Sequence, residues 1–161
     1  MKKLTIVFTL LIIFNSCTND SEEDQFSSLI GDWSNVETID NERLSQSSRY
    51  SFNSDKTFVV STVIIKNDTN EILGYRYRAI GIYSVNENKL TLKSSEIYTH
   101  DDSKDDMYSN IDELKTTNEN FERSFKFFID QNKKIVTFIY PPCDPLEDCL
   151  DKECFKRINE N

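Results

Sequence analysis

The chain has 161 residues, of which 19 are Lys or Arg and 28 are Asp or Glu, and its formal net charge is −9. An acidic surface repels nucleic acid and anionic lipid headgroups, so we expect no binding to DNA or RNA. Aromatic residues make up 12% of the chain, whereas alanine, the best helix former, occurs only at Ala79. This balance favours an all-β domain.

The first sixteen residues have the three zones of a secretory signal peptide. Lys2 and Lys3 give a positive start, residues 4–14 form a run of Leu, Ile, Val, Phe and Thr, and Asn15 and Ser16 are small and polar. This order is typical of a segment that is removed after export. The run is too short to span a bilayer, which takes about 20 apolar residues. We therefore assign residues 1–16 to a signal peptide.

The cysteine that follows changes the kind of signal. The sequence Phe14-Asn15-Ser16-Cys17 resembles the lipobox of bacterial lipoproteins, although Phe14 stands where that family prefers an aliphatic residue. The resemblance implies that Cys17 becomes the first residue of the mature chain and carries lipid. Each buried CH₂ group contributes about 0.8 kcal/mol, so multiple acylation holds a protein firmly on a membrane. The alternative is an ordinary signal peptide with an unmodified cysteine at its cleavage site.

Residues 17–28 are polar, acidic and without periodicity. This composition favours solvation over packing, so we predict a disordered tether between the membrane and the domain. The stretch is also similar to the acidic export signals of Bacteroidota-type lipoproteins. That resemblance implies a lipid-anchored protein of the outer membrane, at the cell surface or on the periplasmic face.

The remaining residues, 29–161, are predicted to form one domain. The polar segments 53–56, 86–89 and 130–133 each combine Asn or Asp with Lys and lie between two apolar runs. Because Asn and Asp favour turns, this pattern is typical of β-hairpins. Strands that follow one another in the chain are therefore expected to pair antiparallel in the sheet.

Alternation of apolar and polar residues supports this interpretation. Tyr75 and Tyr77 alternate with Arg76 and Arg78, which indicates one buried face and one solvated face. Gly81 lies inside the same run and predicts a bend or a bulge. We predict eight strands, at residues 33–39, 48–53, 57–65, 72–85, 89–98, 121–130, 134–140 and 154–159.

Residues 100–120 lie between the fifth and sixth predicted strands and are charged and poor in apolar residues. We expect a surface loop there. Asn110 and Glu113 have the spacing of a capping box, which predicts one short helix at that point.

Three cysteines remain after Cys17. An exported protein can form disulfides, and an odd number leaves at least one thiol unpaired. We favour a Cys143–Cys154 bridge, with Cys143–Cys149 as the alternative. The spacing of the three is poor for zinc, and no histidine lies near them in the sequence.

A further resemblance rests on Gly31-Asp32-Trp33, at the start of the first predicted strand. Gly-x-Trp at that place, together with the later pieces "FNSDKTF" and "GIYSVNENKLTL", resembles the lipocalin-like domains of Bacteroidota lipoproteins. The resemblance covers about residues 28–159. It implies an eight-stranded antiparallel up-and-down barrel whose floor is closed by Trp33, with Arg157 packed over the ring. The alternative is that Trp33 is a core residue of another β-sandwich.

The sequence offers little chemistry for catalysis. His100 is the only histidine and lies beside several aspartates, but this segment lacks the glycine and the alternate spacing of a calcium loop. We therefore interpret it as a solvated acidic loop, and we expect no metal site, no cofactor and no enzymatic activity.

Two functions remain open. The first is a lipid-anchored binding module that holds a small apolar ligand or an envelope protein. The second is a structural or accessory cell-surface lipoprotein with a filled barrel and no small-molecule ligand. Eight antiparallel strands enclose space for side chains or for one small ligand, so the strand count is compatible with both.

Overall fold

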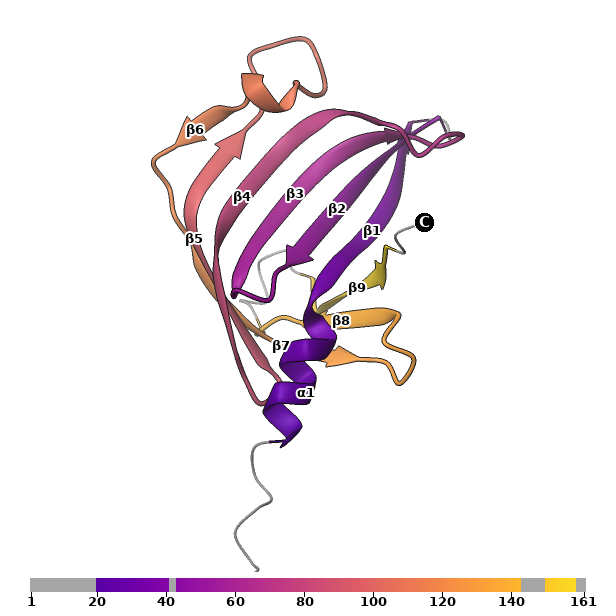
Figure 1. The fold of residues 1–161 in the computed structure, drawn as a ribbon. Helices are drawn as coiled ribbons and strands as arrows, with labels where there is room; N and C mark the ends of the chain where they lie inside the picture. The colour runs from indigo at the N-terminus through magenta and orange to yellow at the C-terminus, as the bar shows by residue number, and fades with distance from the viewer. Residues whose placement is uncertain (1–19, 41–42, 143–149, 159–161) are drawn as a thin grey trace, which may run out of the picture.

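The computed structural model describes residues 20–40, 43–142 and 150–158, which form one antiparallel sheet curved into a barrel (Figure 1). A helix precedes the sheet. In chain order the elements are α1 (Asp20–Leu29), β1 (Gly31–Asp40), β2 (Leu44–Phe52), β3 (Thr57–Lys66), β4 (Ile72–Asn86), β5 (Lys89–Thr99), η1 (Ile111–Glu113), β6 (Lys115–Thr117), β7 (Glu122–Ile129), β8 (Ile135–Ile139) and β9 (Lys152–Arg157).

Eight of these strands close a ring. Strands β1 to β5 follow one another, β7, β8 and β9 continue the sheet, and β9 pairs with β1. Each neighbouring pair in the ring is antiparallel. The predicted eight-stranded antiparallel up-and-down barrel is therefore confirmed. The main difference in extent is β2, which begins at Leu44 rather than at residue 48.

The three predicted hairpin turns are present. In the β2–β3 turn, the Lys56 N–H donates to the Asn53 carbonyl at 3.1 Å, and Lys56 has a φ of 66°. Lys133 has a φ of 56° at the corresponding place in the β7–β8 turn. A residue with positive φ after a tight turn is a common way to close a hairpin. The Asp130 carboxylate accepts bonds from the backbone of Ile135 and Lys134, which lowers the pKa of Asp130.

The ninth strand, β6, was not predicted because the strand opposite β5 is interrupted. β6 pairs with the last part of β5, whereas β7 pairs with its first part. Between the two pairings, the Phe121 N–H donates to Ser94 Oγ at 2.8 Å and the Ser94 N–H donates to the Phe121 carbonyl at 3.0 Å. The predicted loop is correspondingly shorter. Its predicted helix is the 3-10 turn η1, where the Asn110 N–H donates to the Glu113 carboxylate at 3.3 Å.

Gly81 marks a bulge, as predicted. Ile80 faces Glu96 while Gly81 faces Ser94, so one residue of β5 has no partner opposite it. A Cβ atom on Gly81 would lie 2.1 Å from the carbonyl oxygen of Lys93. Only glycine permits the two strands to approach this closely, and the added twist of a bulge helps the sheet to curve.

The two ends of the barrel differ in how completely the wall closes. We call the end that carries α1 and the turns 53–56, 86–89 and 130–134 the floor end, and the opposite end the far end. β1 pairs with β9 only at Trp33 and Ser34, although β1 continues to Asp40. Strands β7 to β9 therefore complete the ring only around its floor half, and the longer strands β1 to β5 extend beyond them (Figure 1).

The core fills the floor half of the ring. Its buried side chains come from every strand of the ring: Trp33, Phe52, Phe58, Val60, Ala79, Tyr83, Leu90, Leu92, Ile97, Phe125, Phe127, Val136, Phe138 and Phe155, with Leu29 from α1. The rings make close contacts, such as 4.8 Å between the centroids of Phe125 and Phe138 and 5.1 Å between those of Phe138 and Phe155. The abundance of Phe in the sequence is thus used to pack the interior.

The prediction of a disordered tether is wrong for residues 20–28, which belong to α1. The physical reason is one apolar side chain within the polar stretch and another directly after it. Leu29 is fully buried in the core, and Phe26 stacks on Tyr83 with ring centroids 5.8 Å apart. Lys56 Nζ lies 5.7 Å from the centroid of the Phe26 ring. Tertiary packing of one helix face thus outweighs the polar composition.

Candidate functional site

The floor end is closed by the residues that the Gly-x-Trp resemblance singled out. Trp33 is fully buried at the start of β1, and Arg157 Cζ lies 4.2 Å from the centroid of its ring. Trp33 and Arg157 are also directly paired across β1 and β9. The predicted contact is present, and it lies at one of the two residue pairs that close the ring. A guanidinium over an indole face is a favourable cation–π geometry.

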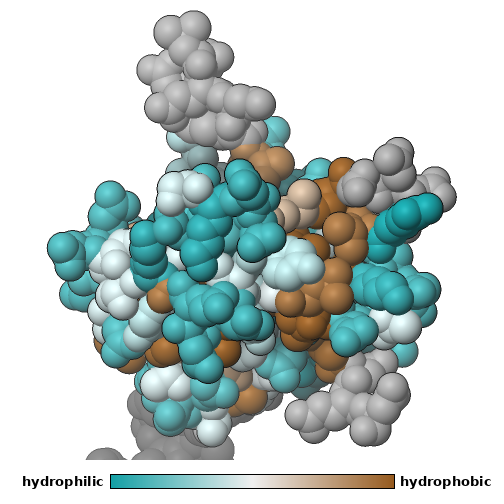
Figure 2. All heavy atoms as spheres, turned by 90° about the horizontal axis from the view of Figure 1, so that it is seen from above, coloured by the Kyte–Doolittle hydropathy of each residue, from teal (hydrophilic) through white to brown (hydrophobic). Residues whose placement is uncertain are grey.

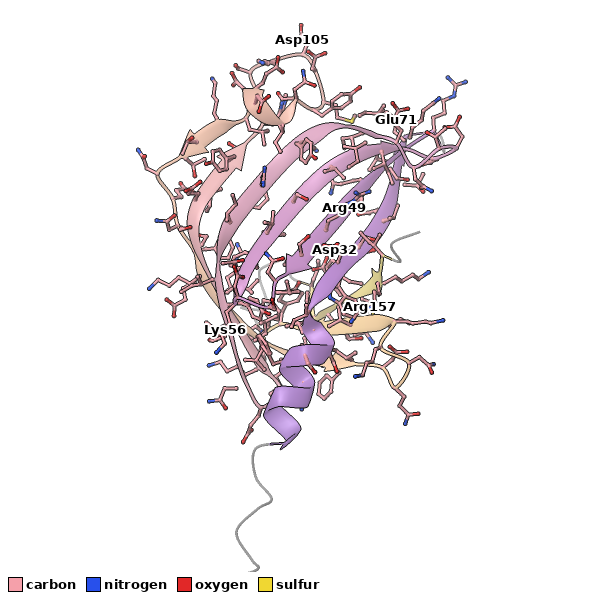
Figure 3. All side chains as sticks on the ribbon, in the orientation of Figure 1. Asp32, Arg49, Lys56, Glu71, Asp105 and Arg157 are labelled. Atoms are coloured by element: carbon pink, nitrogen blue, oxygen red, sulfur yellow. The ribbon has the colours of Figure 1, made fainter. Side chains whose placement is uncertain are left out.

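Arg157 and Trp33 also hold the end of α1. Arg157 Nη2 donates to the Ser28 carbonyl at 2.6 Å, and Nη1 donates to the Ile30 carbonyl at 2.8 Å. Trp33 Nε1 donates to the Leu29 carbonyl between them at 2.8 Å. The last carbonyls of a helix lack partners within the helix and carry partial negative charge. Here Trp33 and Arg157 satisfy three successive carbonyls, two of which accept from the Arg157 cation. Figure 3 labels Arg157 beside the junction of α1 and β1.

Gly31 is required by the same contact. Its φ of 125° is disfavoured for residues that carry a Cβ atom, and a Cβ atom there would lie 2.6 Å from Arg157 Nη1. Glycine therefore permits both the turn from α1 into β1 and the approach of the guanidinium. Gly31, Trp33 and Arg157 form one structural unit, which we call the floor lock.

A second group of residues lies inside the ring on the far side of the core, and sequence reasoning missed it. Tyr50, Tyr77 and Tyr140 pack against the core from β2, β4 and the end of β8. Tyr50 lies edge-on to Phe138 and Phe155, with centroid distances of 5.3 and 5.1 Å. Alternation of apolar and polar residues indicates which side chains of one strand face inward. It does not indicate which tyrosines of different strands contact one another. We call these three residues the tyrosine layer.

Two charged residues adjoin the tyrosine layer. The Tyr140 hydroxyl donates to the Glu153 carboxylate. Burial, and after it the Glu153 charge, raises the pKa of Tyr50, and burial together with Tyr50 and Glu153 raises the pKa of Tyr140. The Arg123 charge acts in the opposite direction on both tyrosines. The two phenols therefore stay protonated at neutral pH and can donate hydrogen bonds.

A surface groove of about 410 Å³ reaches Tyr140. We call it the Tyr140 groove. Its exposed apolar side is made by Ile139 and the two prolines that follow Tyr140, and two lysines stand at its edge. The lining residues are Lys89, Ser124, Phe125, Lys126, Ile139, Tyr140, Pro141 and Pro142. An apolar surface with adjacent ammonium groups suits a ligand that combines an apolar body with a negative charge.

The far end carries the acidic loop. Residues 102–107 are exposed, as predicted, and the Asp101 carboxylate contacts Lys115 Nζ at 2.5 Å, which lowers the pKa of Asp101. His100 itself is buried, contrary to the expectation of a solvated segment. Its Nδ1 lies 2.8 Å from Ser109 Oγ, which is also buried in this part of the loop. Within residues 20–40, 43–142 and 150–158 no group of three or more His, Cys, Asp or Glu residues has the arrangement of a metal site.

Figure 2 views the molecule from the far end. Hydrophilic atoms cover most of this face, the largest exposed apolar region lies right of centre, and smaller apolar areas are visible at the lower left. Among the residues that the structure describes, no helix has the length and apolar character to cross a membrane.

The cysteine predictions fall mainly outside the described ranges. Cys17, Cys143 and Cys149 lie outside the residues that the structure describes. The lipidation and both candidate disulfides therefore stay predictions. Cys154 is exposed on β9 and forms no disulfide with another residue of the described ranges, and its sulfur lies 3.6 Å from Thr137 Oγ1.

Comparison with known proteins identifies no relative: no family model, no curated protein and no solved structure matches this chain.

The floor lock generates a stability prediction. Trp33→Ala should lower the free energy of unfolding by about 3–5 kcal/mol, because it removes a fully buried indole and leaves a cavity. Urea denaturation followed by circular dichroism measures the change. The control Ile82→Ala, at a side chain 59% exposed on β4, should stay within about 0.5 kcal/mol of the parent. A loss below about 1 kcal/mol at Trp33 would show that the lock contributes little.

Proposed function

We propose that this chain is a lipid-anchored envelope lipoprotein with a lipocalin-like, non-catalytic barrel that binds a small apolar ligand in the Tyr140 groove. The observation that carries the binding proposal is the groove itself. It joins exposed apolar side chains on one side of the wall to the Tyr140 ring, which packs against the core. The outer membrane is the proposed location.

The anchor is supported by the order of segments in the sequence. A charged start, a short apolar run and Cys17 precede the first described residue, Asp20. Lipid on Cys17 would place the barrel at a membrane surface without any spanning helix. The lipocalin-like assignment is supported by the strand order and by the contact of Arg157 with Trp33.

The size of the Tyr140 groove favours a small molecule over a protein partner. Its volume of about 410 Å³ falls within the range of small-molecule pockets, roughly 300–1,000 Å³. A specific protein interface needs a much larger contact area, of roughly 800 Å² on each partner. Lys89 and Lys126 are exposed beside the groove and add preference for an anionic head on the ligand.

The proposal of a non-catalytic protein is supported by the environment of His100. Its Nδ1 is engaged by Ser109, and its buried Nε2 has no hydrogen-bond partner among the described residues. A serine nucleophile needs a base whose other nitrogen is held by a third group. The nearby Asp101 carboxylate instead contacts Lys115 and Ser103.

One observation favours the second candidate, a structural or accessory lipoprotein. The floor half of the barrel is filled by side chains, among them Phe52, Phe58 and Phe138, each at most 1% exposed. A ligand site deep in that half would require these rings to move. The Tyr140 groove lies at the wall and does not require such movement, which is why we place the ligand there.

The anchor is tested by Cys17→Ser in the natural host. Without the thiol no lipid can be attached, so the protein should move from the membrane fraction to the soluble fraction. Immunoblotting of the two fractions measures the change, with Cys154→Ser as the control that should stay membrane-bound. Unchanged membrane retention of Cys17→Ser would contradict the anchor.

The ligand site is tested with anilinonaphthalene sulfonate, a probe with an apolar body and a negative charge. Ile139→Asp should weaken the probe's dissociation constant by about tenfold or more, because it places an unpaired carboxylate in the apolar lining. Fluorescence titration measures the affinity.

Ile135→Asp is the matched control for this titration. Ile135 lies on the same strand and, four residues away, on the same face, and it is 38% exposed against 37% for Ile139. It does not line the Tyr140 groove. Equal affinities for the two variants, both near that of the parent, would place the probe elsewhere and contradict the proposed site.

A further inference from the structure

We propose that α1 is a short rigid strut that turns the floor end of the barrel toward the membrane and the far end away from it. This inference deepens the proposed function and rests on its lipid anchor at Cys17. It concerns the surface formed by the hairpin turns around the base of α1.

Only a short length of chain separates the lipid from the folded part. Cys17 is three residues from Asp20, where α1 begins. A fully extended chain covers at most about 3.6 Å per residue, so this connection spans at most about 11 Å. α1 has 10 residues and adds about 15 Å at 1.5 Å per residue. The floor of the barrel therefore lies within about 26 Å of the lipidated residue.

Helix α1 is fixed to the barrel at its C-terminal end. Its last residue, Leu29, is fully buried, and Phe26 packs on Tyr83 of β4. At its C-terminal end, Arg157 and Trp33 bond its carbonyls. A helix with buried side chains and a bonded end cannot swing freely around the barrel. In Figure 1, α1 projects from the floor end, and its N-terminus is directed away from the sheet.

The two ends of the barrel carry different side chains. The floor turns carry four lysines against three carboxylates, a small positive excess, and Phe128 beside them is 50% exposed; these charged residues are Lys56, Lys89, Lys133 and Lys134, with Asp55, Glu87 and Asp130. Ammonium groups beside an exposed aromatic ring suit the phosphate-rich interface of a bilayer. The loop at the far end carries an excess of Asp instead. Figure 3 shows Lys56 near the base of α1 and Asp105 at the tip of the far-end loop.

The acidic start of α1 limits how much electrostatic attraction to the membrane can contribute to the attachment. Residues 20–24 have the sequence DSEED, so four acidic residues lie between the lipid and the floor. Anionic headgroups would repel these four carboxylates, and the lysines of the floor turns offset part of this repulsion. The attachment is therefore supplied by the lipid, and the short strut, aided by the floor lysines, sets the orientation.

The orientation is tested on full-length lipidated protein in vesicles of phosphatidylethanolamine and phosphatidylglycerol whose headgroups carry an energy-transfer acceptor. A donor dye is coupled to azidophenylalanine placed at Gln131 in a floor turn, or at Asp105 in the far-end loop. Both side chains are exposed. Energy transfer is expected to be strong from position 131 and largely lost from position 105. Equal transfer from both positions, or stronger transfer from 105, would overturn the proposal.

A second pair of variants tests the strut. A flexible insert of about 12 Gly and Ser residues between Asn19 and Asp20 adds roughly 20 Å of reach. It should abolish most of the difference between the two dye positions. The same insert between Asp105 and Asp106 should leave transfer from position 131 unchanged. If the first insert leaves the difference intact, the strut does not set the orientation and the proposal fails.

The assay separates this inference from the proposed function. Failure of the lipidated protein to sediment with vesicles would remove the anchor, and the orientation with it. Sedimentation with equal transfer from both dye positions would leave the anchor in place and overturn only the orientation.

Discussion

The structure depends on the contacts of one guanidinium group. Arg157 pairs with Trp33 across the closing seam of the barrel, packs on its ring and bonds the carbonyls of Ser28 and Ile30. These contacts join the first and last strands of the ring to the helix that precedes them. Because the β1–β9 seam has only two residue pairs, the closure of the ring depends on this corner more than on strand pairing.

The floor lock also explains why the two ends of the barrel differ. Around the lock, β7 to β9 complete the wall and the interior is packed with aromatic rings. Beyond it β1 continues to Asp40 without β9 as a partner. The tyrosine layer packs against the aromatic core cluster, and one of its members, Tyr140, lines the Tyr140 groove. A rigid floor and a less enclosed far half are compatible with binding at the wall, because ligand entry there does not disturb the packed rings.

Most of the fold could be predicted from local patterns. Polar turns and period-two alternation are properties of adjacent residues, so the eight strands of the ring and the bulge at Gly81 were predictable. Helix α1 was not, because its stability comes from Phe26 and Leu29 packing against β4 and the core, and these partners are distant in the sequence. β6 was missed because it has only three residues, all polar.

The candidate site was less predictable than the fold. The Trp33–Arg157 contact followed from a family resemblance, since neither residue shows from the sequence alone that the other lies above it. The tyrosine layer depends on the register of three separate strands, which alternation does not specify. The Tyr140 groove depends in addition on the direction of the chain after β8. Such features arise from tertiary structure and have no local signal in the sequence.

Hydrogen exchange of the backbone amides in residues 25–30 tests the central claim most directly. If Arg157 and Trp33 hold α1 on the barrel, these amides should be protected at a level close to that of β1. Exchange at the rate of an unstructured peptide, in a protein whose strand amides remain protected, would show that α1 is not held on the barrel and would contradict the account.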